Sequence, residues 1–307
     1  MLQTQIALLK KYGLPVRGFS GQHLLVDPNI QRKIIEVLQP VPQERILEIG
    51  PGLGALTVEI LAAGACVIAI EKDKRFCEIL EGELGDDFKG KFHIENGDVL
   101  KTDLKKLISV SRRALARSRG SKQPTRLKVI SNLPYYITSP VLFWLIDNRA
   151  QVEKAVLMMQ REVADRLVAQ PGDKDYGRLT LAIRYYADVH RVFHVSRNCF
   201  TPRPDVDSSV VTVDFHPSSK LPKKIDERFL FHIIQVGFGA RRKTLINRLA
   251  GDEEIGKTRS DLIGIFQKIG IPENARAENL LLKDFLSLAG VLQTGTLLEK
   301  ETQGVRR

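Results

Sequence analysis

The stretch that decides the fold is Glu48-Ile-Gly-Pro-Gly-Leu-Gly-Ala55. It closes a short apolar run that starts at Arg45, and it opens a pattern of helical periodicity from Leu56. Its glycines allow a tight turn and let a ligand approach the backbone without a Cβ in the way. A strand, a glycine turn and a helix in this order are typical of α/β proteins that bind nucleotides. A purely structural glycine turn is the alternative.

Similar apolar runs recur along the chain, and each is short enough to be a strand buried on both faces. The predicted strands are Arg45–Ile49, Cys66–Ile70, Lys91–Ile94, Leu127–Ile130 and Ala155–Met159. The predicted helices between the first of them are Leu56–Ala63 and Lys74–Leu84, and a further helix begins after Asp27 and ends before Pro40. The pattern predicts a doubly wound, Rossmann-like α/β sheet.

The second half of the chain has a different pattern. Residues 179–186 are helical in pattern, and Val189–Val195 and Ser209–Phe215 alternate as strands that can add an antiparallel edge to the sheet. Residues 216–224 have linker composition, and a helical pattern then continues to about Leu292. We therefore predict a first domain over residues 1–218, a small all-helical domain over 219–294 and a flexible tail over 295–307. We also expect Leu142, Phe143 and Trp144 to be core residues of a helix after Pro140.

Composition narrows the class of protein. The 307 residues contain 47 Lys+Arg and 36 Asp+Glu, a formal net charge of +11, which favours a polyanionic partner. No apolar run is long enough for a membrane span. Three isolated cysteines exclude a disulfide framework and a standard zinc module, which favours a reducing compartment. We therefore expect a cytoplasmic protein without a structural metal, and nothing in the sequence indicates an obligate dimer.

Much of the net charge comes from one segment. Residues 101–128 contain ten lysines and arginines and a single acid, Asp103. Either they form a solvated loop between two strands, or they contact RNA. The sequence leaves both interpretations open.

Two carboxylates follow predicted strands at the edge where the glycine turn lies. Glu71 ends the second strand about twenty residues after the turn, where it can accept hydrogen bonds from both ribose hydroxyls. Asp98 follows the third strand and could hold the exocyclic amine of an adenine, although a turn or helix cap is the simpler role. The constellation predicts an adenosine-type ligand. Gly50, Gly52 and Ala55 also satisfy the dinucleotide fingerprint, so NAD and S-adenosylmethionine both stay open at this point.

The fourth strand ends in Asn132-Leu-Pro-Tyr135, which favours methyl transfer to an adenine amine. The lone pair of that amine is delocalised into the ring, which makes the nitrogen a poor nucleophile. The side-chain oxygen of Asn132 and the carbonyl of Leu133 could accept both N–H protons and favour a tetrahedral nitrogen. Pro134 fixes the backbone, and Tyr135 offers a face for an extruded base. Alone, the tetrapeptide could equally be an ordinary strand-ending turn.

With these motifs in order, the chain resembles the KsgA-type family of ribosomal RNA small-subunit adenine dimethyltransferases over nearly its whole length. The matching segments are Gly21-Gln-His-Leu-Leu-Val-Asp-Pro28, Glu48-Ile-Gly-Pro-Gly-Leu-Gly54, Asn132-Leu-Pro-Tyr135, Gln160-Arg-Glu-Val-Ala-Asp-Arg-Leu-Val168, Tyr176-Gly-Arg-Leu179, Phe200-Thr-Pro-Arg-Pro-Asp-Val-Asp-Ser208 and Arg241-Arg-Lys-Thr244. The resemblance implies transfer of methyl groups from S-adenosylmethionine to N6 of two adjacent adenosines in the 3′-terminal hairpin of small-subunit rRNA, within an assembling subunit. It assigns catalysis to the first domain, with part of the cofactor site in residues 1–26, and RNA binding to the helical domain.

The resemblance also implies roles for particular residues. The cofactor contacts fall on His23, Leu25, Gly50, Glu71, Asp98 and Asn132, with Gly52 and Gly54 completing the glycine loop. Asn132, Leu133, Pro134 and Tyr135 would hold the target adenine, with Phe200 as a second stacking face. His23 departs from the family, which usually has Asn at this position. The predicted rRNA contacts are Arg241, Arg242, Lys243 and Arg248, on a helix of the C-terminal domain.

Three other functions stay under consideration. A large-subunit rRNA methylase of the macrolide-resistance type would share the glycine loop and a similar Asn-Pro-Tyr element. An RNA-binding assembly or transcription factor could use the same fold without depending on catalysis. An NAD-dependent dehydrogenase gives no reason for Asn132-Leu-Pro-Tyr135 at a strand end.

Overall fold

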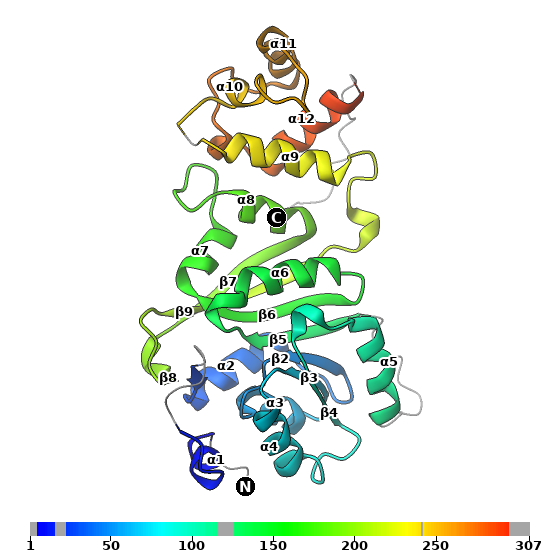
Figure 1. Ribbon diagram of the computed structural model, residues 1–307, viewed down its shortest axis with the longest axis vertical. Coiled ribbons are helices and arrows are strands. Elements are labelled where there is room, and N and C mark those ends of the chain that lie inside the picture. Colours follow the sequence, from blue (N-terminus) through cyan, green and yellow to red (C-terminus); the bar gives the residue numbers. More distant parts are fainter. Residues whose placement is uncertain (1–4, 16–22, 116–125, 241, 295–307) are drawn as a thin grey trace. The chain divides into compact units, whose positions relative to one another are not determined.

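The structure of the protein is a computed structural model, in which residues 5–15, 23–115, 126–240 and 242–294 are described (Figure 1). The chain divides into two compact units, the first comprising Met1–Ala164 and Ala187–Ser219 and the second Asp165–Tyr186 and Lys220–Arg307. The later boundary lies one residue from the position that the sequence indicates. Residues 165–186 group with the second unit, although the sequence places them in the first domain. Tyr176 explains this grouping, because its buried hydroxyl donates to the carbonyl of Leu280, 2.7 Å away.

A seven-stranded sheet forms the centre of the first unit, with the strand order β4-β3-β2-β5-β6-β9-β7. Five strands are parallel: β2 (Arg45–Ile49), β3 (Cys66–Glu71), β4 (Phe92–Asn96), β5 (Leu127–Asn132) and β6 (Val152–Gln160). The other two, β9 (Ser208–Phe215) and β7 (Ala187–Val195), add to β6 in antiparallel fashion. The predicted α/β sheet with an antiparallel edge is therefore confirmed.

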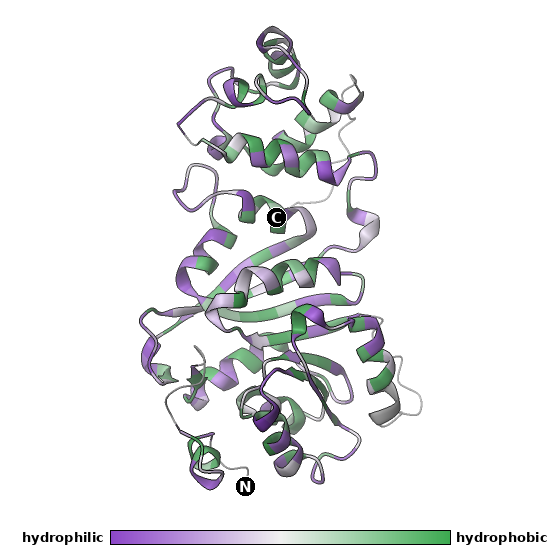
Figure 2. Cartoon of the chain, in the orientation of Figure 1, coloured by the Kyte–Doolittle hydropathy of each residue, from purple (hydrophilic) through white to green (hydrophobic). Residues whose placement is uncertain are grey.

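The strands at the sheet centre are apolar because helices cover them. Every residue of β2 and β3 is buried, and these strands are largely green in Figure 2. The helices and 3₁₀ turns of this unit are α2 (Pro28–Leu38), α3 (Ala55–Ala62), α4 (Lys74–Leu84), η1 (Val99–Lys101), α5 (Leu104–Ala114), η2 (Tyr135–Ile137) and α6 (Thr138–Asp147). Asp27 caps α2 as expected, since its carboxylate accepts from the amide of Asn29 at 2.8 Å.

The N-terminal segment adds elements that the sequence did not indicate. Helix α1 (Gln5–Lys11) precedes β1 (Leu24–Leu25), and β1 pairs antiparallel with β8 (Phe200–Thr201), which follows η3 (Arg197–Cys199). The carbonyl of Leu25 accepts a hydrogen bond from the side chain of Gln31 on α2, 2.8 Å away. This pairing brings the N-terminal segment to the carboxyl edge of the sheet.

The second unit is helical throughout its described part. It contains α8 (Arg178–Tyr186), η4 from Ser218 to Lys220 at its boundary, α9 (Glu227–Phe238), α10 (Leu245–Leu249), α11 (Arg259–Ile269), η5 (Ala277–Asn279) and α12 (Leu282–Thr294), while α7 (Arg161–Val168) crosses the division between the units. Its core includes fully buried Phe266 and Phe285. Among the described helices, none is both long and apolar enough to cross a membrane.

Candidate active site

The glycine turn between β2 and α3 is tight, as the sequence predicts, but its three glycines do not share one role. Gly50, Gly52 and Gly54 have φ angles of +67°, +57° and +81°, which other residues rarely adopt. A Cβ at Gly50 would meet no protein atom within 4 Å, so the space beside this turn is open to a ligand. A Cβ at Gly54 would instead lie 2.8 Å from Cδ2 of Leu80. Gly54 therefore serves helix packing, whereas Gly50 and Gly52 line a cavity.

Glu71 is the buried acid of this edge, with 2% of its surface exposed. Its carboxylate accepts hydrogen bonds from the amides of Gly52 at 3.1 Å and Asp73 at 2.9 Å. Burial raises the pKa of Glu71, and these amide bonds oppose the effect. The carboxylate thus connects the glycine turn to the end of β3.

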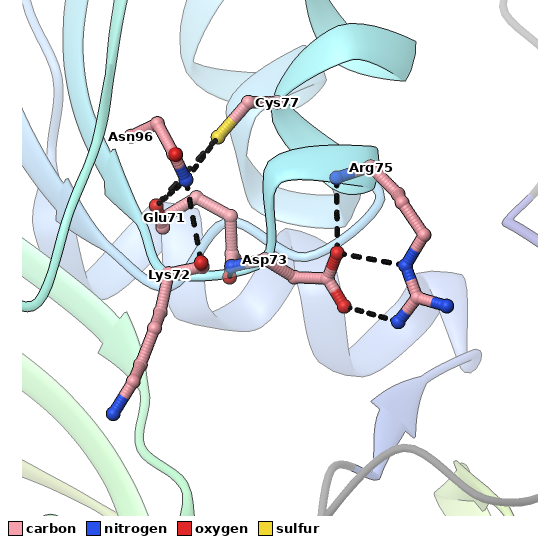
Figure 3. Close-up of polar contacts among 6 residues, drawn as sticks. All are labelled: Glu71, Lys72, Asp73, Arg75, Cys77 and Asn96. Carbon is pink, nitrogen blue, oxygen red and sulfur yellow. Dashed lines mark hydrogen bonds and ion pairs between the residues drawn. The ribbon is translucent and has the colours of Figure 1, made fainter.

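The turn after β3 is held by a residue that the sequence analysis did not single out. Figure 3 shows the side-chain amide of Asn96, from the end of β4, donating to the carbonyls of Glu71 at 3.0 Å and Lys72 at 3.3 Å. Asp73 caps α4 and pairs with Arg75 at 2.6 Å in the same view. An Asn at a strand end followed by Gly97 is the only sequence signal for this role.

Asp98 lies beyond β4, at the same edge as Glu71. Its carboxylate accepts from the amide of Leu100 and pairs with the ammonium of Lys72, each at 3.1 Å. Lys72 holds the pKa of Asp98 below its usual range. Lys72 is thus a direct competitor for any amine that Asp98 could bind.

Two neighbouring cavities border these acids. The first, of about 60 Å³, is lined by Gln5, His23, Leu24, Leu25, Glu48, Gly50, Pro51, Gly52, Ala55, Leu56, Glu71, Asn132, Leu133, Pro134, Tyr135 and Phe200. The second, of about 450 Å³, is lined by Ile49, Gly50, Ile70, Glu71, Lys72, Asp73, Lys74, Gly97, Asp98, Val99, Pro134, Tyr136 and Ile137. They share Gly50, Glu71 and Pro134, so one elongated ligand could extend from Asp98 to Asn132.

Asn132-Leu-Pro-Tyr135 occupies the end of β5 beside the first cavity. The side-chain amide of Asn132 donates to the backbone carbonyl of His23 at 3.1 Å, which leaves its Oδ1 as an acceptor. The backbone amide of Leu133 donates to the backbone carbonyl of Met158 on β6 at 3.0 Å. The hydroxyl of Tyr135 lies 3.1 Å from Oγ of Ser208, and burial raises its pKa. The tetrapeptide is therefore held on both sides by neighbouring strands and by the N-terminal segment.

The structure brings His23, Leu25 and Phe200 together at the first cavity. Leu25 is paired in register with Phe200 through β1 and β8, and both are buried. Nδ1 of His23 lies 2.7 Å from the carbonyl of Pro202, which can only accept. Nδ1 of His23 is therefore the donor of this hydrogen bond. The ring centroids of His23 and Tyr135 are 5.5 Å apart.

Glu48 is a second buried acid of the cavity, and the sequence marks it only as part of the glycine motif. It is 2% exposed, and its carboxylate accepts from the hydroxyl of Thr57 at 2.7 Å. Burial raises the pKa of Glu48 to about 7, and the charge of Glu71 adds to the effect. The sequence signal for this buried acid is the position of Glu48 inside an apolar strand, because a charged residue buried there needs a partner.

The residues of the second unit that we predicted to contact rRNA do not all lie on one helix, and one of them has a structural role. Arg242 and Lys243 are exposed in the turn between α9 and α10, so they do not lie on a helix. Nε of Arg248, on α10, donates to the carbonyl of Val236 at 3.1 Å and holds the end of α9. Arg241 and the tail 295–307 lie outside the described residues.

The basic segment 101–128 also contains two cations with structural roles. One terminal nitrogen of Arg126 donates to the carbonyls of Arg149, Val152 and Phe215. Lys128 donates to the carbonyl of Gln39 at 2.8 Å and pairs with Glu44 at 3.1 Å. These two side chains join strands and loops of the sheet, while residues 116–125 lie outside the described part. Within that part, no cluster of three or more His, Cys, Asp or Glu side chains is arranged to hold a metal.

Comparison with known proteins decides the family. The profile described as "Ribosomal RNA adenine dimethylase" matches residues 15–294. The chain belongs to this family. Curated relatives include ribosomal RNA small subunit methyltransferase A of Geobacillus sp. (strain WCH70), 37% identical over 93% of this chain and 94% of the relative, and that of Moorella thermoacetica, 38% identical over 94% and 96%.

Solved structures agree with this family assignment. A dimethyladenosine transferase from Plasmodium falciparum has a TM-score of 0.69 and 28% identity, covering 89% of this chain and 98% of the other. The 23S rRNA methyltransferase ErmE has a TM-score of 0.65 and 21% identity, covering 88% and 100%, and so shares the fold. The predicted family, fold class and methyltransferase activity are thereby confirmed.

Proposed function

We propose that this chain transfers methyl groups from S-adenosylmethionine to N6 of two adjacent adenosines in the 3′-terminal hairpin of small-subunit rRNA. The observation that carries the proposal is the placement of Asn132-Leu-Pro-Tyr135 against the glycine turn and Glu71, around shared cavities at one sheet edge. Relatives named as small-subunit methyltransferases over more than nine-tenths of the chain support the choice of RNA. The cytoplasmic location, the monomeric state and action within an assembling subunit stay predictions.

The residues present fit the cofactor. Gly50 leaves open space beside the turn, Glu71 would hold the ribose, and Asp98 would hold the adenine amine after release from Lys72. S-adenosylmethionine supplies, when bound, a methyl group on a positively charged sulfur. The acids along this edge favour such a cation.

The substrate side of the site uses uncharged groups. Oδ1 of Asn132 and the carbonyl of Leu133 would accept the two N–H protons of the adenine amine and favour a nucleophilic nitrogen. Tyr135, fixed through Ser208, would stack on the base, and buried Phe200 closes the cavity behind it. The alkylated nitrogen is strongly acidic, so water can take its proton.

The test is mass spectrometry of rRNA after incubation of unmethylated small subunits with the protein and S-adenosylmethionine. We expect N6,N6-dimethyladenosine, and we expect Asn132→Ala to lower the rate about a hundredfold or more, the scale for removing one preorganised polar group from a transition state. Asn29→Ala, an exposed Asn on α2, is the matched control.

The outcomes separate the alternatives. Methylated adenosine in the rRNA of large subunits, incubated in parallel in place of small subunits, would replace this proposal by the macrolide-resistance type of activity. An Asn132→Ala protein that still binds small subunits would show an additional binding role in assembly. Absence of dimethyladenosine with the unaltered protein would refute the proposal, and protection from thermal unfolding by NADH instead of S-adenosylmethionine would favour a dehydrogenase.

A further inference from the structure

Exposed aromatic side chains begin beside the active site and continue along α6. Tyr136 in η2 is 62% exposed and Phe143 in α6 is 47% exposed, and Pro140 between them is exposed as well. The sequence placed Phe143 in the core together with Leu142 and Trp144, which are indeed buried. Phe143 is therefore a large aromatic ring on the surface without a role in packing the core of α6.

A group of cations lies next to this aromatic stripe. Helix α5 buries Leu104 and Leu107 and exposes Lys105 and Lys106, and Figure 2 shows hydrophilic and hydrophobic stretches side by side on its first turns. Lys101, at the end of η1, is also exposed. Within the described part of the chain, the ammonium groups of Lys105 and Lys106 make no hydrogen bond or ion pair, and the charge of Lys101 contributes to the lowered pKa of Asp98. Such clustered cations repel one another unless a polyanion compensates them.

The elements that carry the aromatic and cationic groups pack together. Helix α6 packs on η1, and the indole of Trp144 donates to the carbonyl of Thr102 at 3.3 Å. Tyr136 lines the second cavity of the active site together with Asp98. A groove of about 360 Å³ continues from Asp98 along α5, lined by Lys101, Lys106 and Val110 and also by the acids Glu95 and Asp103. We call Lys101, Lys105, Lys106, Tyr136 and Phe143 the α5–α6 surface.

We propose that the α5–α6 surface binds unpaired rRNA nucleotides next to the target adenosines, with phosphates on the lysines and a base stacked on an exposed aromatic ring. Lysines beside aromatic faces are the combination by which proteins bind single-stranded RNA, since every base has a face that can stack. Arg126 and Lys128 take no part, because their side chains are bound within the sheet. The identity of the RNA rests on the proposed function.

The two halves of the surface predict different salt behaviour. The probe is a fluorescent RNA of the 3′-terminal hairpin with its single-stranded flank, titrated at several salt concentrations. Lys101→Gln/Lys105→Gln/Lys106→Gln should lower the slope of log K against log[salt] by about 2, since each phosphate contact with a single strand contributes about 0.7. Phe143→Ala should weaken binding about tenfold at every salt concentration without a change in slope.

Matched variants control for net charge and exposed apolar area. Lys33→Gln/Lys89→Gln/Lys91→Gln removes three exposed lysines of α2 and the connection before β4 and should keep the wild-type slope. Val41→Ala, at a residue 52% exposed, should keep the wild-type affinity. Phe143→Ala should bind a hairpin without the flank as the wild type does. Binding of S-adenosylmethionine should be unchanged in all variants, which shows that the fold is intact.

The proposal is overturned if the lysine variant keeps the slope of its control, or if Phe143→Ala behaves like Val41→Ala. If the wild-type protein produces no dimethyladenosine in small subunits, the proposed function fails instead. If it methylates and binds but the variants match their controls, only the α5–α6 surface is refuted.

Discussion

Replacement of Glu48 by Gln tests the electrostatics of the buried site directly. Glu48 lies on β2 with 2% of its surface exposed, and Thr57 donates to its carboxylate. Burial raises its pKa from an ordinary carboxyl value of 4.5 to about 7. In the unfolded chain the same group ionises near 4.5. The folded state therefore keeps a proton that the unfolded state has lost at every pH between these values.

The sign and size of the effect follow from this difference. Between pH 4.5 and 7 the folded state binds more protons than the unfolded state, so the free energy of unfolding falls as pH rises. At about 1.4 kcal/mol for each pH unit, the total loss is about 3 kcal/mol. An amide has nearly the same shape, cannot ionise and can still accept from Thr57. The stability of Glu48→Gln relative to wild type should therefore rise by about 3 kcal/mol between pH 4 and pH 8.

Trp144 makes the measurement specific to the first unit. It is the only tryptophan of the chain and is 8% exposed on α6, so its fluorescence reports unfolding of that unit. The free energy of urea unfolding is measured for wild type and for Glu48→Gln between pH 4 and pH 8. Steps of about 0.5 pH unit resolve a change of about 1.4 kcal/mol per pH unit. Glu36→Gln, at an exposed residue of α2, is the control and should parallel wild type. Parallel curves for Glu48→Gln and wild type would refute the reasoning.

Three further changes test other contacts. Gly54→Ala should lower the free energy of urea unfolding by about 1–3 kcal/mol, because φ is +81° and the new Cβ meets Leu80. The control Gly82→Ala, within α4, should raise the free energy of unfolding by up to about 1 kcal/mol. An unchanged free energy of unfolding for Gly54→Ala would contradict the packing role of Gly54. Lys72→Ala should bind S-adenosylmethionine up to about fivefold more tightly by calorimetry, because Asp98 loses its competing partner, and weaker binding would count against it. Arg126→Ala should cost about 3 kcal/mol or more in Trp144-detected unfolding, since three carbonyls lose their donor; wild-type stability with a lower RNA salt slope would reverse that assignment.

The residues at the carboxyl edge of the sheet could be predicted from the sequence, because the sequence patterns that mark them are local or follow from the parallel order of the strands. β2 and β3 are buried on both faces, so their apolar runs stand out without long-range information. The carboxyl ends of parallel strands meet at one edge, which places Glu71, Asp98 and Asn132 together once the strands are assigned. The position of these candidate residues at one sheet edge could therefore be predicted from the sequence.

Other contacts could not be predicted because they join distant or very short segments. β1 and β8 have two residues each and pair Leu25 with Phe200, and no periodicity marks a strand of that length. Charge alone did not distinguish Arg126, bound to three carbonyls, from Lys105, which faces solvent. A helical pattern correctly placed Leu142 and Trp144 in the core but could not show that the ring of Phe143, between them, is exposed.

The charges of the site are consistent with the neutral substrate contacts that we propose. Glu48, Glu71 and Asp98 concentrate acids at the edge that must admit a phosphate backbone, and an acid repels phosphate while it attracts a cationic cofactor. Burial favours the protonated form of Glu48, and Lys72 pairs with Asp98. Groups that contact the target base can then be an amide, a carbonyl and an aromatic ring. Because Lys72 is already paired with Asp98, the lysines of the proposed α5–α6 surface are the groups that we expect to attract the RNA.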